Sequence, residues 1–254
     1  MPLDWIAKTD DRFEFPNATD APRHTVYVKG DGPPILILQE LPGIGIETFD
    51  LADRLIAEGF KVYLPHLFGA LGETISNPLK FARRLWCIRR EFQVFRTGRQ
   101  SEIASWMRAL CAEIQSRENG AQLGVIGMCL TGSFVIPLMA EDAVKGAVAS
   151  QPALPMVFRK NRLHMSQTEV DNACAAMTTK GPALAMRFKS DRISTSAHIQ
   201  ALKSAFGDHL EVAELDNPAG VTGSAHSLLT LDFSDEAWNR TSRYFKSRFG
   251  LEKP

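Results

Sequence analysis

An uncharged run of eighteen residues limits most strongly what this chain can fold into. Residues 123–140 read LGVIGMCLTGSFVIPLMA and carry no charged side chain. That length reaches the range of a membrane-spanning helix, about 18 to 20 residues. However, Gly124, Gly127, Gly132 and Pro137 interrupt the run, and glycine and proline disfavour a continuous helix. We therefore predict a buried strand, a tight turn and a buried helix.

Further apolar runs recur along the chain and are separated by amphipathic stretches. The sequence predicts strands at 24–30, 33–40, 60–69, 121–128, 144–154, 182–191 and 209–218. It predicts helices at 47–60, over most of 79–117, at 195–207 and at 235–249. Strands that alternate with helices predict an α/β fold, in which a mostly parallel central sheet carries helices on both faces.

Nothing in the sequence divides this pattern into separate units. We find no internal repeat, no low-complexity tract and no linker rich in proline, glycine and serine. A chain of 254 residues is within the usual size of one large α/β domain. We therefore predict a single domain over residues 1–254. A polar insertion at 156–180 interrupts the alternation and is interpreted as a cap near the strand ends.

The composition is that of an ordinary globular protein. The 29 basic and 29 acidic residues give a formal net charge of zero, which provides no overall attraction for nucleic acid. The first fifteen residues, MPLDWIAKTDDRFEF, lack the basic and then apolar pattern of a secretory signal, so we expect a cytoplasmic protein without a membrane segment. The four cysteines show neither a C-x-x-C pair nor metal-ligand spacing, which favours free thiols and no metal site.

Cys129 lies where a strand is predicted to turn into a helix. A nucleophile elbow needs this strand–turn–helix order, with small residues beside the nucleophile because the turn approaches neighbouring backbone closely. In GMCLTG, glycine stands two residues before Cys129 and three after it, whereas the strict pattern places glycine where Thr131 stands. The residues alone leave two roles open for Cys129, a nucleophile or a small core side chain.

An effective thiol nucleophile needs a base, and the base needs an orienting acid. In the nucleophile, acid, histidine order, the acid follows a late strand and the histidine follows the last strand. Asp191 ends the predicted strand ALAMRFKSD, and His226 follows the strand VAELDNP. Taken singly, Asp191 is as well explained as the acid that caps helix 195–207, and His226 as a surface loop residue. The three ordered matches favour a catalytic triad.

Several short motifs resemble those of the dienelactone hydrolases, cysteine-dependent enzymes with the α/β-hydrolase fold. GMCLTG resembles the family's G-Y-C-L-G-G, ILQELPGIG its A-Q-E-I-F-G-V-N, VYLPHLFG its V-C-P-D-L-Y-A and AHSL its G-H-S-F. KSDRIST is similar to the acid motif G-x-x-D-x-x-x-P but lacks its proline. The resemblance runs from about residue 24 to 248.

The resemblance implies a role for each matching residue. It implies Cys129 as nucleophile, His226 as base and later acid, and Asp191 as its orienter. It also implies that Glu40 hydrogen-bonds the resting thiol and moves aside when substrate binds. The oxyanion hole is then formed by the backbone N–H groups of Leu41 and Leu130.

The implied reaction is hydrolysis of a small ester or lactone through a thioester, without a cofactor, as in aromatic or haloaromatic breakdown. One departure bears on the substrate. The family holds a carboxylate with arginines, one of them four residues after the histidine, where this chain has Thr230. Residues 83–99 are a possible source of a second arginine, but a helix with basic residues at many positions is more often a solvated face.

Two alternatives to a dienelactone hydrolase-like enzyme stay open. One is a general carboxylesterase or thioesterase on the same scaffold, which a preference for neutral acyl esters would select. The other is a binding protein that keeps the fold and has lost turnover, for which Thr131 and the absent arginine are the hints.

Overall fold

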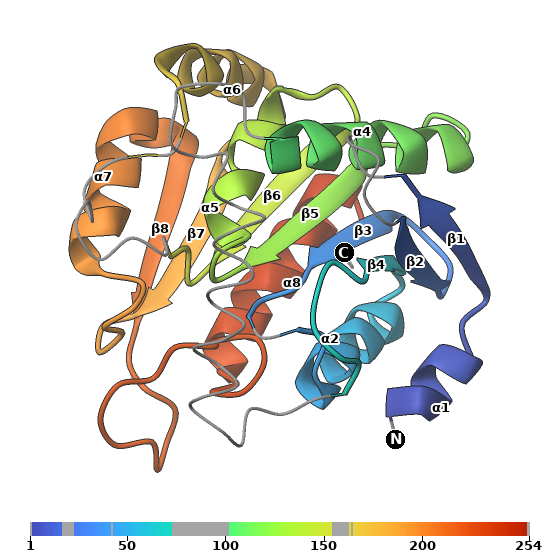
Figure 1. Ribbon diagram of the computed structural model, residues 1–254. Coiled ribbons are helices and arrows are strands. Elements are labelled where there is room, and N and C mark those ends of the chain that lie inside the picture. Colours follow the sequence, from blue (N-terminus) through green and yellow to red (C-terminus); the bar gives the residue numbers. More distant parts are fainter. Residues whose placement is uncertain are drawn as a thin grey trace.

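The strands form one twisted sheet of eight strands. The computed structural model describes residues 2–16, 23–41, 43–72, 102–153, 163 and 165–252. Within these residues the strand order is β1-β2-β4-β3-β5-β6-β7-β8 (Figure 1). The strands span Asp11–Phe15 (β1), His24–Lys29 (β2), Pro34–Leu38 (β3), Lys61–Pro65 (β4), Leu123–Met128 (β5), Val144–Ser150 (β6), Ala183–Phe188 (β7) and Leu210–Leu215 (β8).

Six of the strands run parallel, which confirms the predicted sheet. The neighbours from β4 through β3, β5, β6 and β7 to β8 pair in parallel, whereas β1–β2 and β2–β4 pair antiparallel. All residues of β3, β5 and β7 are buried, as expected for strands that are covered on both faces. The carboxyl ends of these strands meet at one edge of the sheet.

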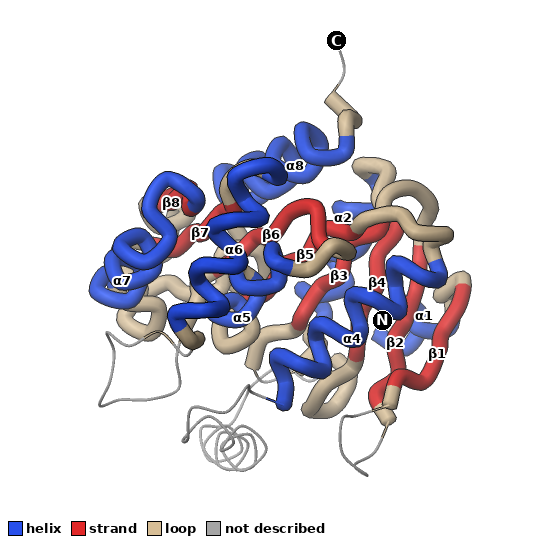
Figure 2. Tube along the Cα trace, turned by 90° about the horizontal axis from the view of Figure 1, so that it is seen from above, coloured by secondary structure: helices blue, strands red, loops and turns tan. Residues whose placement is uncertain are grey.

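Helices cover both faces of the sheet, and two apolar clusters fill the space beneath them. Figure 2 shows these layers on either side of the strands. The helices are α1 (Pro2–Ala7), α2 (Ile46–Ala57), α4 (Glu102–Arg117), α5 (Gly132–Val135), η2 (Pro137–Ala140), α6 (Gln167–Lys180), α7 (Ser196–Phe206), η3 (Gly207–His209) and α8 (Asp235–Phe249). One cluster joins α4, α5, α6 and α7 to the sheet, and the other joins α1, α2 and α8 to its opposite face.

The structure differs from the sequence predictions in the N-terminal region and after β5. Helix α1 and strand β1 were not predicted, because α1 has only six residues and β1 is an edge strand, DRFEF, rich in charge. The buried helix predicted after Cys129 is one turn, α5, followed by the 3-10 turn η2, because Pro137 lacks the N–H that would continue the helix.

Two predictions fall partly outside the described residues. The helical region 79–117 is described from Glu102 onward, as α4. Of the insertion predicted as a cap at 156–180, residues 156–162 and 164 lie outside the description, and its second half forms α6. Helix α6 packs Val170, Ala173 and Met177 into the core, so this half belongs to the helical layer.

None of the described helices is both long and apolar enough to cross a bilayer.

Candidate active site

Cys129 occupies a strained turn directly after β5. Its φ of 55° lies in the left-handed region, which residues other than glycine rarely adopt. Its N–H donates to the carbonyl oxygen of Ser150 at 3.0 Å, which ties the turn to β6. A Cβ on Gly127 would lie 2.5 Å from Val135 and 2.7 Å from the carbonyl oxygen of Thr131, so the turn needs glycine there. These features are those of a nucleophile elbow.

Thr131 fits this elbow although the strict pattern has glycine at its position. Its hydroxyl accepts the N–H of Met128 at 2.9 Å and lies 3.0 Å and 3.2 Å from the carbonyl oxygens of Leu38 and Gln39. The side chain is fully buried. Thr131 therefore joins the elbow to the end of β3, and the departure from the family pattern strengthens the turn.

We expect Thr131→Val to destabilise the protein by about 1–3 kcal/mol. The change keeps the shape of the side chain but leaves the buried N–H of Met128 without its acceptor. Urea unfolding measures the free energy, and Thr131→Ser, which keeps the hydroxyl, is the matched control. A Thr131→Val protein as stable as the Ser variant would show that these hydrogen bonds contribute nothing.

Asp191 and His226 form a hydrogen-bonded pair. The Oδ2 atom of Asp191 lies 2.7 Å from the Nδ1 atom of His226. Its Oδ1 atom accepts the N–H groups of Ile193 and Ser194 at 2.8 Å and 3.0 Å, which fixes the carboxylate. The cap of α7 is Thr195, whose hydroxyl accepts a backbone N–H of the helix, so the alternative role of Asp191 as that cap does not apply.

The imidazole of His226 also interacts with Cys129. Burial alone lowers the pKa of His226, but the hydrogen bond to Asp191, the interaction with Cys129 and the charges of these two groups outweigh it and raise the pKa to about 10. Asp191 occupies Nδ1, so Nε2 is the ring atom left for Cys129, and within the described part of the chain it makes no hydrogen bond. The structure thus brings the three residues of the predicted triad together.

The loop that carries His226 is anchored by Asp232. The backbone N–H of His226 donates to the Oδ2 atom of Asp232 at 2.7 Å, and the N–H of Asp232 donates to the carbonyl oxygen of Ser227 at 3.0 Å. This closed turn fixes the backbone from which the imidazole projects. Sequence reasoning did not single out Asp232, whose only signal is an acid six residues after the histidine.

Glu40, at the end of β3, is buried beside the triad and hydrogen-bonded on both oxygens. Its Oε2 atom accepts the side-chain amide of Gln151 at 3.0 Å and the hydroxyl of Ser227 at 2.8 Å, and Oε1 accepts the hydroxyl of Thr230. Burial raises the pKa of Glu40, although these three hydrogen bonds and the charge of His226 act to lower it. The resemblance implies a bond from Glu40 to the thiol of Cys129; among the described hydrogen bonds, those of Glu40 go to the three other side chains.

The backbone N–H groups of the two expected oxyanion donors, Leu41 and Leu130, have no acceptor among the described residues. Leu130 follows Cys129 and is buried, and Leu41 follows Glu40 and is half-buried. Both groups are therefore available to a substrate oxygen.

Arg187 supports the acid turn and was missed by sequence reasoning. This residue of β7 is 2% exposed, and its Nε and Nη2 atoms donate to the carbonyl oxygens of Ser194 at 2.6 Å and Asp191 at 2.9 Å. It also pairs with Glu214 on β8. Its signal in the sequence is a single charge inside an apolar strand, which marks a buried cation that needs partners.

The described residues do not provide the two arginines of the family's carboxylate clamp. Residues 83–99, from which a second arginine was expected, lie outside the description. Thr230, which stands where the family has the first arginine, is buried and donates to Glu40. Residue 230 therefore holds the side chain of Glu40 by a hydrogen bond.

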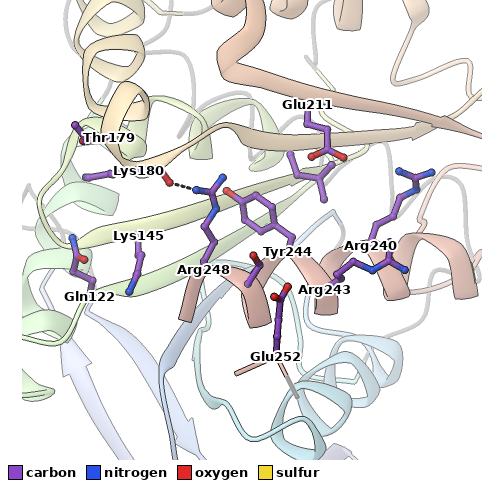
Figure 3. Close-up of a pocket in the computed structure, with 12 residues that line it drawn as sticks. Gln122, Lys145, Thr179, Lys180, Glu211, Arg240, Arg243, Tyr244, Arg248 and Glu252 are labelled. Carbon is purple, nitrogen blue, oxygen red and sulfur yellow. Dashed lines mark hydrogen bonds between the residues drawn. The ribbon is translucent and has the colours of Figure 1, made fainter. Parts of the chain in front are cut away.

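A separate hollow of about 650 Å³ lies at the opposite edge of the sheet (Figure 3). Its wall includes Lys145 at the start of β6, Lys180 at the end of α6 and Arg248 on α8. Lys180 donates to the carbonyl oxygen of Glu141 at 2.7 Å, and Arg248 donates to that of Pro182 at 2.7 Å. These two cations join loops at the amino ends of the strands, far from the carboxyl ends that carry the triad.

The sequence matches the dienelactone hydrolase family over residues 24–247. Among solved structures, a putative dienelactone hydrolase from Klebsiella pneumoniae is 18% identical, with a TM-score of 0.55 over 95% of this chain and 99% of that one. A dienelactone hydrolase-like promiscuous phosphotriesterase, P91, from metagenomic libraries is 13% identical, with a TM-score of 0.63 over 94% and 98%. The esterase Pf2001 of Pyrococcus furiosus is 12% identical, with a TM-score of 0.58 over 97% and 95%. No curated protein matches the sequence.

Proposed function

Because this chain belongs to the dienelactone hydrolase family, we propose that it is a cysteine-dependent hydrolase of small esters or lactones. The observation that carries the proposal is the hydrogen-bonded pair of Asp191 and His226, whose pKa also responds to Cys129 in the strained elbow. A binding protein without turnover has no need of a strained thiol held against a buried histidine–carboxylate pair. A family enzyme with this arrangement has the parts for acyl transfer.

In the first step the Sγ atom of Cys129 attacks the acyl carbon. An imidazolium beside the sulfur favours its thiolate form by charge, and the raised pKa of His226 keeps the ring protonated at neutral pH. The carbonyl π-electron pair moves to oxygen, where the N–H groups of Leu41 and Leu130 stabilise the anion. When the intermediate collapses, the bond to the leaving oxygen breaks, and His226 gives that oxygen its proton.

In the second step water releases the acyl group. His226, now neutral, accepts a proton from water while the water oxygen attacks the thioester carbon. Collapse of this intermediate breaks the C–S bond and returns the thiolate and imidazolium. Asp191 keeps the ring in one orientation through both steps. The sequence of steps uses only side chains and backbone of this chain together with water, so we propose that no cofactor takes part.

We propose neutral acyl esters and lactones as the substrate class. Thr230 stands where the family has its first carboxylate-binding arginine, and its hydroxyl donates to Glu40. A substrate carboxylate would therefore lack the cation that the family places at this position. This favours the carboxylesterase alternative over an enzyme specific for an anionic lactone.

Parallel assays with a neutral and an anionic substrate test this proposal. We expect the wild-type protein to hydrolyse a short-chain nitrophenyl ester, and to consume the anionic dienelactone, followed by its absorbance, with a lower kcat/KM. Faster consumption of the dienelactone would restore the anionic substrate class. Turnover of neither compound would instead favour the binding protein.

Domain organisation, substrate size and cellular compartment are further parts of the proposal. We propose one catalytic domain over residues 1–254 that acts on a small molecule in the cytoplasm. Fractionation of the source cells, with activity followed in the soluble and membrane fractions, tests the compartment.

A further inference from the structure

The segment that directly follows β6 contacts two parts of the site. The carbonyl oxygen of Ser150 accepts the N–H of Cys129 at 3.0 Å, and the N–H of Ala153 donates to the carbonyl oxygen of Cys129 at 2.9 Å. The carbonyl oxygen of Pro152 accepts the hydroxyl of Ser194, in the acid turn, at 2.7 Å. This segment therefore sets the nucleophile elbow against the turn that carries the acid.

Gln151 lies in the middle of this segment in a strained conformation. Its φ of 35° is unusual for a residue other than glycine, and its side chain is fully buried. The hydroxyl of Ser150 donates to its Oε1 atom, which leaves the Nε2 atom to donate to Glu40 at 3.0 Å. Strain at a buried position persists only where the surrounding contacts hold it, and such positions cluster at functional sites.

Glu40 links Gln151 to the loop that carries His226 through hydrogen bonds. The carboxyl group that accepts the amide of Gln151 also accepts the hydroxyls of Ser227 and Thr230. Ser227 is the next residue after His226. A continuous chain of hydrogen bonds therefore runs from the end of β6, through Glu40, to the backbone beside the catalytic base.

We propose that Gln151 is a positioning residue, which fixes Glu40 as an anchor for the loop of His226. The neighbours of Gln151 hold Cys129, so one short segment sets the distance between nucleophile and base. The inference deepens the proposed function and rests on it. In this role Glu40 holds the loop of the base in place through its hydrogen bonds with Ser227 and Thr230.

Gln151→Asn separates a positioning role from a merely structural one. Asparagine adopts positive φ more readily than glutamine, so the variant is expected to fold at least as well as the wild type. Its amide is one methylene shorter and cannot hold Glu40 in place. We expect kcat to fall about tenfold or more with little change in KM, because a small displacement of the base slows the chemical step.

A double-mutant comparison tests whether Gln151 acts through Glu40. Thr230→Val removes a hydrogen bond to the other oxygen of the same carboxyl group. If both residues act by holding Glu40, the double variant loses less kcat than the product of the two single losses. Thr241→Val on α8, which removes a buried hydroxyl bonded to the carbonyl oxygen of Ala237 at 2.8 Å, controls for loss of a buried hydrogen bond. It is expected to lower the melting temperature and leave kcat unchanged.

Two results would overturn the inference. One is a folded Gln151→Asn protein with wild-type kcat; the other is a double variant whose losses multiply. Gln151→Met, which has the same length without the amide, replaces Gln151→Asn if that variant does not fold.

If the wild type shows no ester turnover, the proposed function fails, and the rate of iodoacetamide alkylation at Cys129 is measured in place of kcat. A rate equal in wild type and variant then rejects the positioning role.

Discussion

Cys129→Ala is expected to lower kcat for a nitrophenyl ester by about 10⁴-fold or more, because the variant lacks the atom that forms the acyl bond. The side chain is small and 9% exposed, so its truncation leaves the fold intact. Steady-state rates over a range of ester concentrations, corrected for spontaneous hydrolysis, measure the loss. Melting temperatures of both proteins establish that the loss is not one of folding.

Cys111→Ala is the matched control for this variant. Cys111 is a free, fully buried cysteine on α4, and burial raises the pKa of its thiol to about 12. A thiol in that state is a poor nucleophile at neutral pH. We expect wild-type kcat in Cys111→Ala, assayed well below its melting temperature so that a change in stability does not affect the rate. Equal rates for Cys129→Ala and the wild type would reject the triad.

Asp191→Asn is expected to lower kcat by about 10³–10⁴-fold. An amide that donates to Nδ1 favours the wrong tautomer of His226 and no longer stabilises the imidazolium. The two backbone N–H groups that Asp191 accepts can bond the amide oxygen of asparagine, so the turn is retained. Steady-state kinetics on the same ester measure the change, and a loss below tenfold would contradict the role of the acid.

The same variant has a predicted effect on the dependence of activity on pH. The pKa of His226 is raised to about 10, so the imidazolium persists through neutral pH and is lost as the pH rises through about 10. We therefore expect kcat/KM of the wild type to fall at that alkaline limit. Without the charge of Asp191 the limit moves toward lower pH. An unchanged alkaline limit in Asp191→Asn would show that this carboxylate does not hold the proton on His226.

The raised pKa of His226 also makes the free energy of unfolding depend on pH. A histidine whose folded pKa lies above its unfolded value of about 6.5 stabilises the protein fully below that value. The stabilisation is then lost as the pH rises toward about 10, the raised pKa of His226. The difference in unfolding free energy between wild type and Asp191→Asn should therefore shrink between neutral pH and pH above about 10. Taking the difference removes the other groups that titrate in this range.

The fold was predictable where the sequence carries its own periodicity. Strand β5 is uncharged and bounded by glycines, and α8 shows helical spacing with Ser234 as its cap. Each predicted strand core lies in the sheet, and all of them except β2 pair in the expected parallel arrangement. Strand β1 was missed because it is short, charged and half-exposed, so no apolar pattern marks it.

The site was predictable in its order along the chain and less so in its supporting contacts. Cys129, Asp191 and His226 follow strand ends, and parallel strands bring those ends to one edge. Gln151 has no local signal, because its partner Glu40 is 111 residues away in sequence. Side-chain hydrogen bonds of that range depend on the assembled sheet.

The mass of the acyl-enzyme identifies the residue that carries the acyl group. A nitrophenyl ester is mixed with the protein, quenched in acid within the first turnovers, and the protein is digested and analysed by mass spectrometry. We expect one acyl group on the peptide that contains Cys129, removable by hydroxylamine as a thioester, and none in Cys129→Ala. An acyl group on another residue, or turnover with no acyl group on Cys129, would contradict a thioester mechanism at this elbow.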